Sequence, residues 1–166
     1  AVVGAGPTGV EMAGTMAEIA QQTLSAEFRR IDSRVARVIL LEGAPRVLGT
    51  FTEDLSKRAK EQLEMLGAEV LTGAKVTNIT AFGIHYDLNE TQADGTTKAV
   101  SHFLPSRTVV WAAGVAASPL GRALAKSTGC QLDRAGRVIV QPDLTIPGHN
   151  NIYVVGDLAS AKSYLD

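Results

Sequence analysis

The stretch AVVGAGPTGVEMAG, residues 1–14, sets two valines directly before three closely spaced glycines. Val2 and Val3 are β-branched and predict a short buried strand that ends at Gly4. Beyond the glycines, apolar residues recur at helical spacing, namely Ala13, Ala17, Ala20, Leu24, Phe28 and Ile31. The sequence therefore predicts a strand, a tight glycine turn and one long helix from Gly9 to about Ile31.

The same alternation continues along the chain. ARVILLE, residues 36–42, is a β-branched run that predicts a buried strand ending in an acid, Glu42. Thr52 predicts the cap of a second helix, and Gly67 predicts its end. AEVLTG, residues 68–73, predicts a third strand. This order of strands and helices predicts an α/β fold with a doubly wound parallel sheet.

The pattern changes at Lys75. Three runs of alternating residues follow, KVTNITA (75–81), GIHYDL (83–88) and KAVSHFL (98–104), the last two joined by a turn at Asp94-Gly95. They predict an antiparallel β-meander laid over the parallel sheet. TVVWAAG, residues 108–114, predicts a further strand, and we place a domain boundary after Gly114, which gives domains 1–114 and 115–166. Beyond it, RVIV (137–140) and NIYVV (151–155) predict strands, the second of them buried.

Gly4, Gly6 and Gly9 form the pattern GxGxxG between a strand and a helix, which is the context that a dinucleotide-binding loop requires. In such a loop the first glycine permits the tight turn, the second lets backbone approach a pyrophosphate, and the third lets the helix pack against the strand. Pro7 and Thr8 complete the loop at the helix amino terminus, whose free N–H groups favour phosphate. The alternative is that the glycines serve only a tight turn.

Glu42 is the second part of this pattern. An acid at the end of the second strand accepts hydrogen bonds from the ribose hydroxyls of an adenosine and repels a 2′-phosphate, which favours NADH. Glu42 lies 33 positions beyond Gly9, a longer interval than is usual for this motif, and this favours an extended first helix. Arg46, four residues after Glu42, leaves NADPH as the alternative.

Composition excludes several classes of function. Sixteen Lys and Arg residues against seventeen Asp and Glu residues give a net charge of −1, so the sequence predicts no nucleic-acid partner. The apolar runs are too short to span a bilayer, and a single cysteine, Cys130, fits a reducing, cytoplasmic compartment. The three histidines lack the spacing of metal ligands, so no metal site is expected.

Four stretches together resemble the type II NADH dehydrogenases, NADH:quinone oxidoreductases of the pyridine nucleotide-disulfide oxidoreductase superfamily. They are GAGPTGVEMAG (4–14), VILLEGAPRVL (38–48), VVWAAGV (109–115) and GRVIVQPDLTIPGHNNIYVVGDLA (136–159). The resemblance implies a Rossmann-like fold of the FAD/NAD(P)-binding type. In that family an NADH-binding domain interrupts an FAD-binding domain.

By this resemblance, residues 1–114 are an excised NADH-binding domain, and residues 115–166 are part of the segment that returns to the FAD-binding domain. The implied cofactors are NADH and, in the parent protein, FAD, held mostly by segments outside this chain. The implied partner of the parent is quinone. Contact with the cytoplasmic face of the membrane would come only through those other segments, and a homodimer is also allowed. The isolated chain is expected to be inactive.

The resemblance also carries over to single residues. Glu11 matches a glutamate near the nicotinamide and flavin, where it would orient the ring or relay protons; the alternative is an acid favoured by the helix dipole in the first turn. Ala113 and Gly114 match a small-residue turn beside the nicotinamide, or simply end a strand. Gly156 and Asp157 match a motif that holds the phosphate and ribityl groups of FAD.

Two other functions stay open on sequence alone. One is the nucleotide domain of another NAD(P)H flavoprotein reductase, of the ferredoxin or disulfide type. The other is a nucleotide-sensing module without catalysis. The absence of a CxxC pair argues against the thioredoxin reductase branch.

Overall fold

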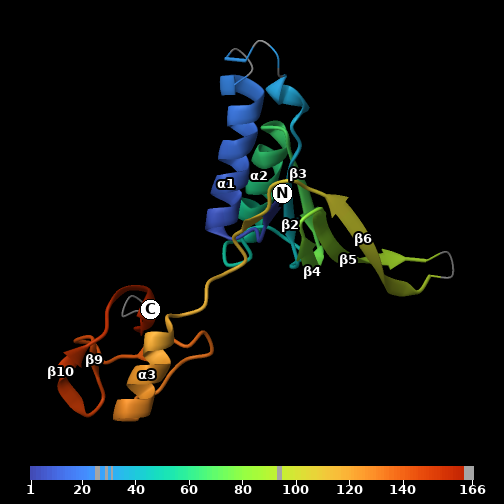
Figure 1. Ribbon diagram of the computed structural model, residues 1–166. Coiled ribbons are helices and arrows are strands. Elements are labelled where there is room, and N and C mark those ends of the chain that lie inside the picture. Colours follow the sequence, from blue (N-terminus) through green and yellow to red (C-terminus); the bar gives the residue numbers. More distant parts are fainter. Residues whose placement is uncertain (25–26, 29, 31, 93–94, 163–166) are drawn as a thin grey trace. The chain divides into compact units, whose positions relative to one another are not determined.

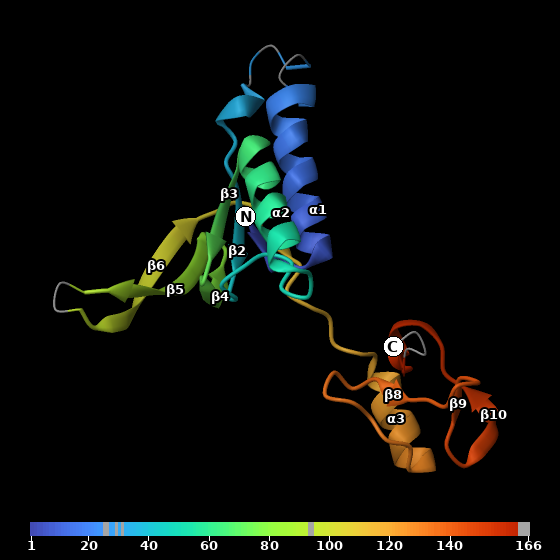
Figure 2. The same ribbon diagram turned by 180° about the vertical axis from the view of Figure 1, so that it is seen from behind.

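The chain divides into two compact units, Ala1–Gly114 and Val115–Asp166 (Figure 1, Figure 2). The computed structural model describes residues 1–24, 27–28, 30, 32–92 and 95–162. The assignment of NADH to the first unit and of a returning FAD segment to the second remains a prediction.

A four-stranded parallel sheet organises the first unit. It contains β1 (Val2–Val3), β2 (Val38–Glu42), β3 (Ala68–Thr72) and β7 (Val110–Trp111), in the order β3-β2-β1-β7. Strand β1 lies between β2 and β7, and both neighbours run parallel to it. The predicted parallel α/β sheet is thus confirmed. An exposed ion pair, Arg37–Glu69, joins the entry of β2 to β3, and its hydrogen bonds lower the pKa of the Glu69 carboxyl.

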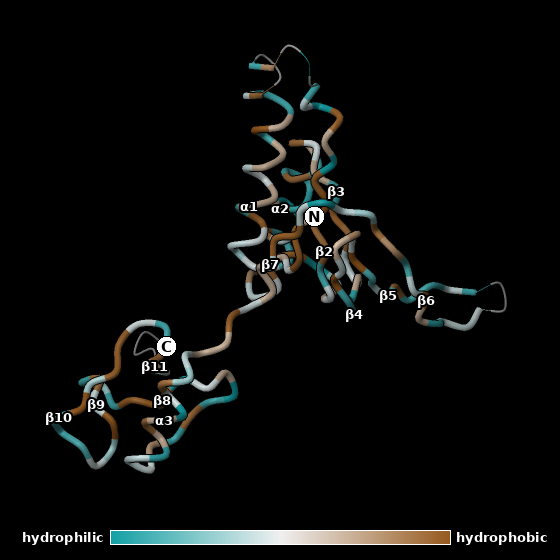
Figure 3. Tube along the Cα trace, in the orientation of Figure 1, coloured by the Kyte–Doolittle hydropathy of each residue, from teal (hydrophilic) through white to brown (hydrophobic). Residues whose placement is uncertain are grey.

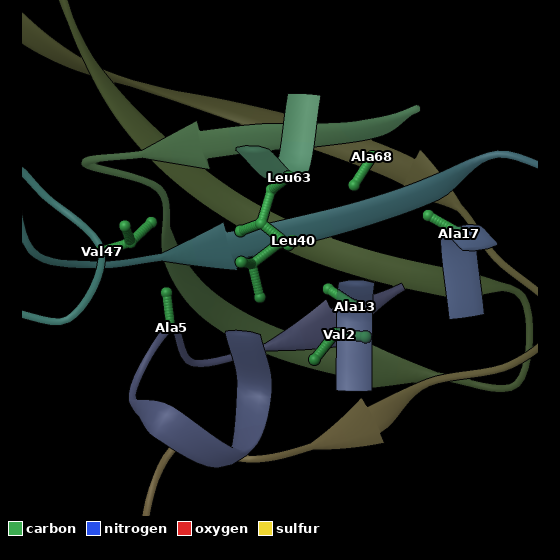
Figure 4. Close-up of a cluster of buried hydrophobic side chains, with 8 residues drawn as sticks. All are labelled: Val2, Ala5, Ala13, Ala17, Leu40, Val47, Leu63 and Ala68. Atoms are coloured by element: carbon green, nitrogen blue, oxygen red, sulfur yellow. The ribbon is translucent and has the colours of Figure 1, made fainter. Parts of the chain in front are cut away.

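Helices cover one face of this sheet. Helix α1 (Pro7–Glu18) and helix α2 (Glu53–Met65) pack there side by side (Figure 1). Their core consists of eight buried residues, drawn in Figure 4: Val2, Ala5, Ala13, Ala17, Leu40, Val47, Leu63 and Ala68. The buried face of α1 is lined by alanines, so its backbone approaches the sheet closely.

An antiparallel meander covers the opposite face, as predicted. It consists of β4 (Lys75–Thr80), β5 (Gly83–Thr91) and β6 (Thr97–Pro105), in sequential order. Its buried residues Ile84 and Leu104 pack with residues of β1 and β2 in a second core cluster. The valines of β1 divide between the two faces, since Val2 belongs to the helical core and Val3 to the meander core. Figure 3 shows β2 as largely hydrophobic, whereas the meander strands β5 and β6 alternate between hydrophobic and hydrophilic residues.

The first helix is shorter than predicted. Helix α1 ends at Glu18 and continues only as a π-helical turn, η1 (Ile19–Thr23). The Ser33 hydroxyl donates a hydrogen bond of 2.7 Å to the Ala20 carbonyl, while the Leu24 amide donates to Ile19 five residues back. The α-helical ladder is therefore replaced at this point. Phe28 lies outside the helix and is half exposed, and Ile31 lies outside the described residues.

The connections follow the turn chemistry of the sequence. Thr52 occupies the amino-cap position of α2, although its side chain makes no capping bond, and Gly67 follows the helix with φ +92°. A short 3-10 turn, η3 (Ser33–Val35), precedes β2. Gly95, between β5 and β6, has φ +79°, and Asp94 of the predicted turn lies outside the described residues.

The second unit is smaller. Helix α3 (Pro119–Thr128) accompanies two short strand pairs, β8 (Val138–Ile139) with β11 (Ala159–Ser160), and β9 (Thr145–Ile146) with β10 (His149–Tyr153). A 3-10 turn, η4 (Gly156–Leu158), follows β10. Buried residues Val138, Ile146 and Val154 form its core.

The prediction that NIYVV is a buried strand is wrong for three of its five residues, since Asn151, Tyr153 and Val155 are exposed and β10 ends at Tyr153. Ile152 and Val154 face the core of the second unit, whereas Tyr153 and Val155 are 63% and 66% exposed. Successive side chains of an extended chain point to opposite sides, and β10 packs on the core of its own unit through one side only.

Two glycines of α1 provide a test of this packing. A Cβ on Gly9 would overlap the Gly4 carbonyl oxygen, which is backbone and cannot move aside. A Cβ on Gly14 would lie 3.5 Å from the nearest Leu63 methyl, an ordinary contact. We expect Gly9→Ala to lower the free energy of unfolding by roughly 2 kcal/mol. Gly14→Ala should raise it by about 0.5–1 kcal/mol.

Urea denaturation followed by far-UV circular dichroism would measure both variants. Gly14→Ala is the matched control because it adds the same methyl group to the same helix. A Gly9→Ala variant as stable as the parent would contradict the close contact between α1 and the glycine turn.

Candidate functional site

A cleft of about 440 Å³ opens where β1, β2 and β7 end at their carboxyl edge. Five predicted site residues line it together, Gly4, Gly6, Glu42, Ala113 and Gly114. Strand β1 is the point where the sheet order reverses, because the chain passes from it to β2 and β3 on one side while β7 lies on the other. Such a switch point at the carboxyl edge is where open α/β sheets bind ligands.

Gly4 brings two sides of the cleft together. Its φ of +97° favours glycine, and a Cβ there would lie 2.6 Å from the backbone nitrogen and Cα of Ala113. The Gly4 amide donates to the Leu41 carbonyl at 2.8 Å, and the Ala112 amide donates to the Val3 carbonyl at 2.8 Å. The ends of β1, β2 and β7 are thereby held in fixed positions beside one another.

Gly6 differs from the other two glycines of the motif. A Cβ on Gly6 would meet no atom within 4 Å, and its φ of −70° is accessible to any residue. Gly6 also occupies the amino-cap position of α1, which has no side-chain capping bond and has Pro7 in its first turn. The fold therefore does not require glycine at this position, and the space beside it is open to the cleft.

The Glu42 carboxylate makes two hydrogen bonds within the protein. Its Oε2 accepts from the Ala5 amide at 2.6 Å, and its Oε1 accepts from the Ala44 amide at 2.7 Å. Ala5 belongs to the glycine loop, and Ala44 belongs to the loop that follows β2. An ionised carboxylate offers about four acceptor positions, so about two remain for a ligand.

Arg46 does not line the cleft. Its Nη2 donates to the Gly49 carbonyl at 2.9 Å, and its side chain lines a separate pocket of about 260 Å³ beside α2. The positions of Arg46 and Glu42 therefore do not favour Arg46 as a ligand of a 2′-phosphate in this cleft.

Other predicted residues lie outside the cleft lining. Pro7, Thr8 and Gly9 form the first turn of α1 next to Gly6. Glu11 is exposed on the same helix, and because α1 begins at Pro7, no acid lies in its first turn. The alternative interpretation of Glu11 as a first-turn acid is therefore wrong.

Gly156 and Asp157 lie in the second unit. Gly156 has φ +69° and begins η4, and Asp157 lines a cleft of about 660 Å³ within this unit. Arg137 lines the same cleft, with its Nε 2.7 Å from an oxygen of Asp133. These features provide a polar edge to that cleft.

Sequence reasoning missed several residues that line the first cleft, namely Gly43, Ala74, Lys75, Val76 and Trp111. The Ala74 amide donates to the Glu42 backbone carbonyl at 2.8 Å, which places the start of β4 beside the end of β2. The position of Lys75, separated from the third strand by only two residues, was the available signal, because the carboxyl ends of parallel strands share one edge. Trp111 is 58% exposed, and its Nε1 donates to the Gly114 carbonyl at 3.3 Å.

Within the described residues, no helix is both long and apolar enough to cross a membrane. The same part of the chain contains no group of three or more histidine, cysteine or acidic side chains placed to hold a metal ion.

Two of the curated relatives that this chain matches are type II NADH:quinone oxidoreductases. The chain is 51% identical over 97% of its length to the type II NADH:quinone oxidoreductase Ndh of Mycobacterium tuberculosis, and it covers 33% of that protein. It is 48% identical over 95% of its length to NdhA of the same organism, of which it covers 32%. The chain thus spans about a third of the curated relatives it matches, and the predicted resemblance to this group is confirmed.

A solved structure is also similar. The structure of NDH2 from Plasmodium falciparum in complex with NADH matches 96% of this chain with a TM-score of 0.80 and 26% identity, and the chain covers 31% of it. The family model of the pyridine nucleotide-disulphide oxidoreductases matches residues 1–165. With its parallel sheet, glycine turn and carboxyl-edge cleft, the chain belongs to the pyridine nucleotide-disulphide oxidoreductase family.

Proposed function

We propose that the first unit is the NADH-binding domain of a flavin-dependent NADH:quinone oxidoreductase and that NADH lies along the cleft at the carboxyl edge of the sheet. The open space at Gly6 carries this proposal. At Gly4 and Gly9 the packing of the backbone leaves no room for a Cβ. At Gly6 there is room for one, so the fold gives no reason for a glycine there. A glycine kept open beside an uncapped helix amino terminus fits the close approach of a pyrophosphate.

The adenosine would lie toward β2 and β3. Glu42 keeps about two acceptor positions, which matches the two hydroxyls of one ribose. Ala74 and Val76 offer apolar surface beyond Glu42 for the adenine ring, and Lys75 lies between them in sequence.

The nicotinamide would lie toward β7. Ala112, Ala113 and Gly114 present backbone and small side chains there, so a planar ring can approach closely. NADH, when bound, supplies a hydride, and the residues of this chain bind and orient it for transfer to FAD. The role of Glu11 near the nicotinamide is part of this proposal.

FAD would meet this chain at Gly156 and Asp157. A carboxylate can accept a hydrogen bond from a ribityl hydroxyl, and the left-handed backbone at Gly156 leaves space next to it. The identity with two NADH:quinone oxidoreductases favours quinone as the electron acceptor over the ferredoxin or disulfide reductase alternatives.

Gly6→Val tests the position of the pyrophosphate. The valine should fit the fold, since nothing lies within 4 Å of its Cβ, yet it should occupy the space proposed for the phosphates. We expect NADH affinity to fall at least roughly tenfold in calorimetric titration, with an unchanged circular dichroism spectrum. Gly49→Val is the matched control, because its Cβ is equally open but Gly49 does not line the cleft. Equal NADH affinities for Gly6→Val and the parent would exclude this loop as the phosphate site.

Glu42→Ala tests cofactor choice. The parent chain should bind NADH more tightly than NADPH, by roughly tenfold, because the Glu42 charge repels a 2′-phosphate. Glu42→Ala should narrow this ratio, since it removes both the acceptor and the repulsion. Arg46→Ala should leave the ratio unchanged, because Arg46 lines another pocket. A selective loss of NADPH affinity in Arg46→Ala would instead support the NADPH alternative.

The purified 166-residue chain should be colourless and unable to oxidise NADH. Gly156 and Asp157 are two polar contacts, whereas retention of a large cofactor normally requires a cleft that encloses most of its surface. The visible spectrum would reveal bound flavin, and NADH absorbance would be followed with a soluble quinone, with and without added FAD. A retained flavin band, or NADH consumption above that caused by free FAD, would contradict this prediction.

A further inference from the structure

The Glu42 carboxylate lies between two loops of the cleft. One oxygen accepts from the Ala5 amide at 2.6 Å and the other from the Ala44 amide at 2.7 Å. Both distances are at the short end of the range for N–H donors. A side chain whose only role was to bind a ribose would not need the hydrogen bonds from Ala5 and Ala44.

Ala5 is held through both of its backbone groups. Its amide donates to Glu42, and its carbonyl accepts from the Leu48 amide at 2.8 Å. Leu48 has φ +48°, an unfavourable conformation for leucine, so the loop after β2 takes up local strain where it meets Ala5. The Ala5 side chain itself is almost completely buried in the core beneath α1.

We propose that Glu42 is a positioning residue for the glycine loop as well as the acceptor for ribose. This inference rests on the proposed NADH site and adds a second task to one of its residues. Glu42 and Leu48 together fix the peptide groups on either side of Ala5, and the next residue is Gly6, where the pyrophosphate would lie. Loss of the carboxylate should therefore weaken phosphate binding even where no ribose hydroxyl is present.

The variant Glu42→Gln tests the carboxylate itself, because glutamine keeps the shape of the side chain and replaces the carboxylate with an amide. Its side-chain amide has one acceptor oxygen and one NH₂ group, which can only donate. In Glu42→Gln, one of the amides of Ala5 and Ala44 would then face another donor, so at least one of the two bonds is lost. Glu42→Asp is the second variant, since it keeps the charge but is one methylene too short to preserve both bonds.

The nucleotide pair ADP and 2′,3′-dideoxy-ADP tests the proposal. Both carry the same diphosphate, but only ADP has ribose hydroxyls for Glu42 to bind. If Glu42 positions the loop, Glu42→Gln should lower the affinity for dideoxy-ADP by roughly fivefold or more. The affinity for ADP should fall by a larger factor, because the ribose contacts are lost as well. Glu69→Gln is the matched control, because Glu69 is also a hydrogen-bonded strand carboxylate but lies outside the cleft lining.

Calorimetric titration of the full chain would give these affinities. A dideoxy-ADP affinity that is the same in Glu42→Gln and the parent would overturn the positioning role while leaving ribose binding intact. Failure of the unsubstituted 166-residue chain to bind ADP would instead count against the proposed function itself.

A measurement without ligand tests separately whether the Glu42 carboxylate accepts hydrogen bonds from the amides of Ala5 and Ala44. In the NMR spectrum of the parent, the amide protons of Ala5 and Ala44 should resonate downfield because they donate to a carboxylate. At least one should move upfield in Glu42→Gln and in Glu42→Asp, and neither should move in Glu69→Gln. Unchanged Ala5 and Ala44 resonances in both Glu42 variants would overturn the proposal whether or not nucleotide binds.

Discussion

The contact between the start of α1 and the end of β1 is the constraint on which the first unit depends. Gly9 passes so close to the Gly4 carbonyl that a single methyl group would overlap it. Because the helix can begin there, its alanine face reaches the sheet and buries Val2 and Leu40. The same turn brings Gly4 against Ala113, so β7 ends beside the helix amino terminus. The cleft is a consequence of this arrangement of backbone.

Much of this fold could be predicted because its signals are local. β-Branched runs gave the parallel strands, and the change to alternating residues after Lys75 gave the meander. The end of α1 could not be found in this way, because Leu24 and Phe28 continue the helical spacing. Helix α1 ends at Glu18, and in the π-helical turn that follows, the Ala20 carbonyl accepts a hydrogen bond from the Ser33 hydroxyl, 13 positions away. The exposure of Tyr153 at the end of β10 and of Val155 beyond it depends likewise on which side of this segment packs on the core, and the run of apolar residues does not specify that side.

The motif residues that line the cleft could be predicted from the sequence, but the other lining residues could not. Gly4, Gly6 and Glu42 follow from a spacing rule, and Ala113 and Gly114 from a resemblance, and all five line one cleft. Lys75 belongs to no motif, and Trp111 lies in the stretch VVWAAGV without having been given a role of its own. Both residues line the cleft because β4 starts and β7 ends at the same edge of the sheet. Arg46 is the converse case. Its closeness to Glu42 in sequence made NADPH an alternative, yet its side chain lines a different pocket.

On the proposal that Glu42 binds ribose, this residue would be structural and ligand-binding at once. Its two hydrogen bonds to the amides of Ala5 and Ala44 would order both loops before a nucleotide binds, and this would reduce the conformational entropy lost on binding. The carboxylate retains acceptor positions because it has more of them than the two amides use. An amide side chain of the same size lacks that surplus, since it must exchange an acceptor for a donor. Selection for an acid at the end of β2 would then act on the shape of the glycine loop as well as on the choice between NADH and NADPH.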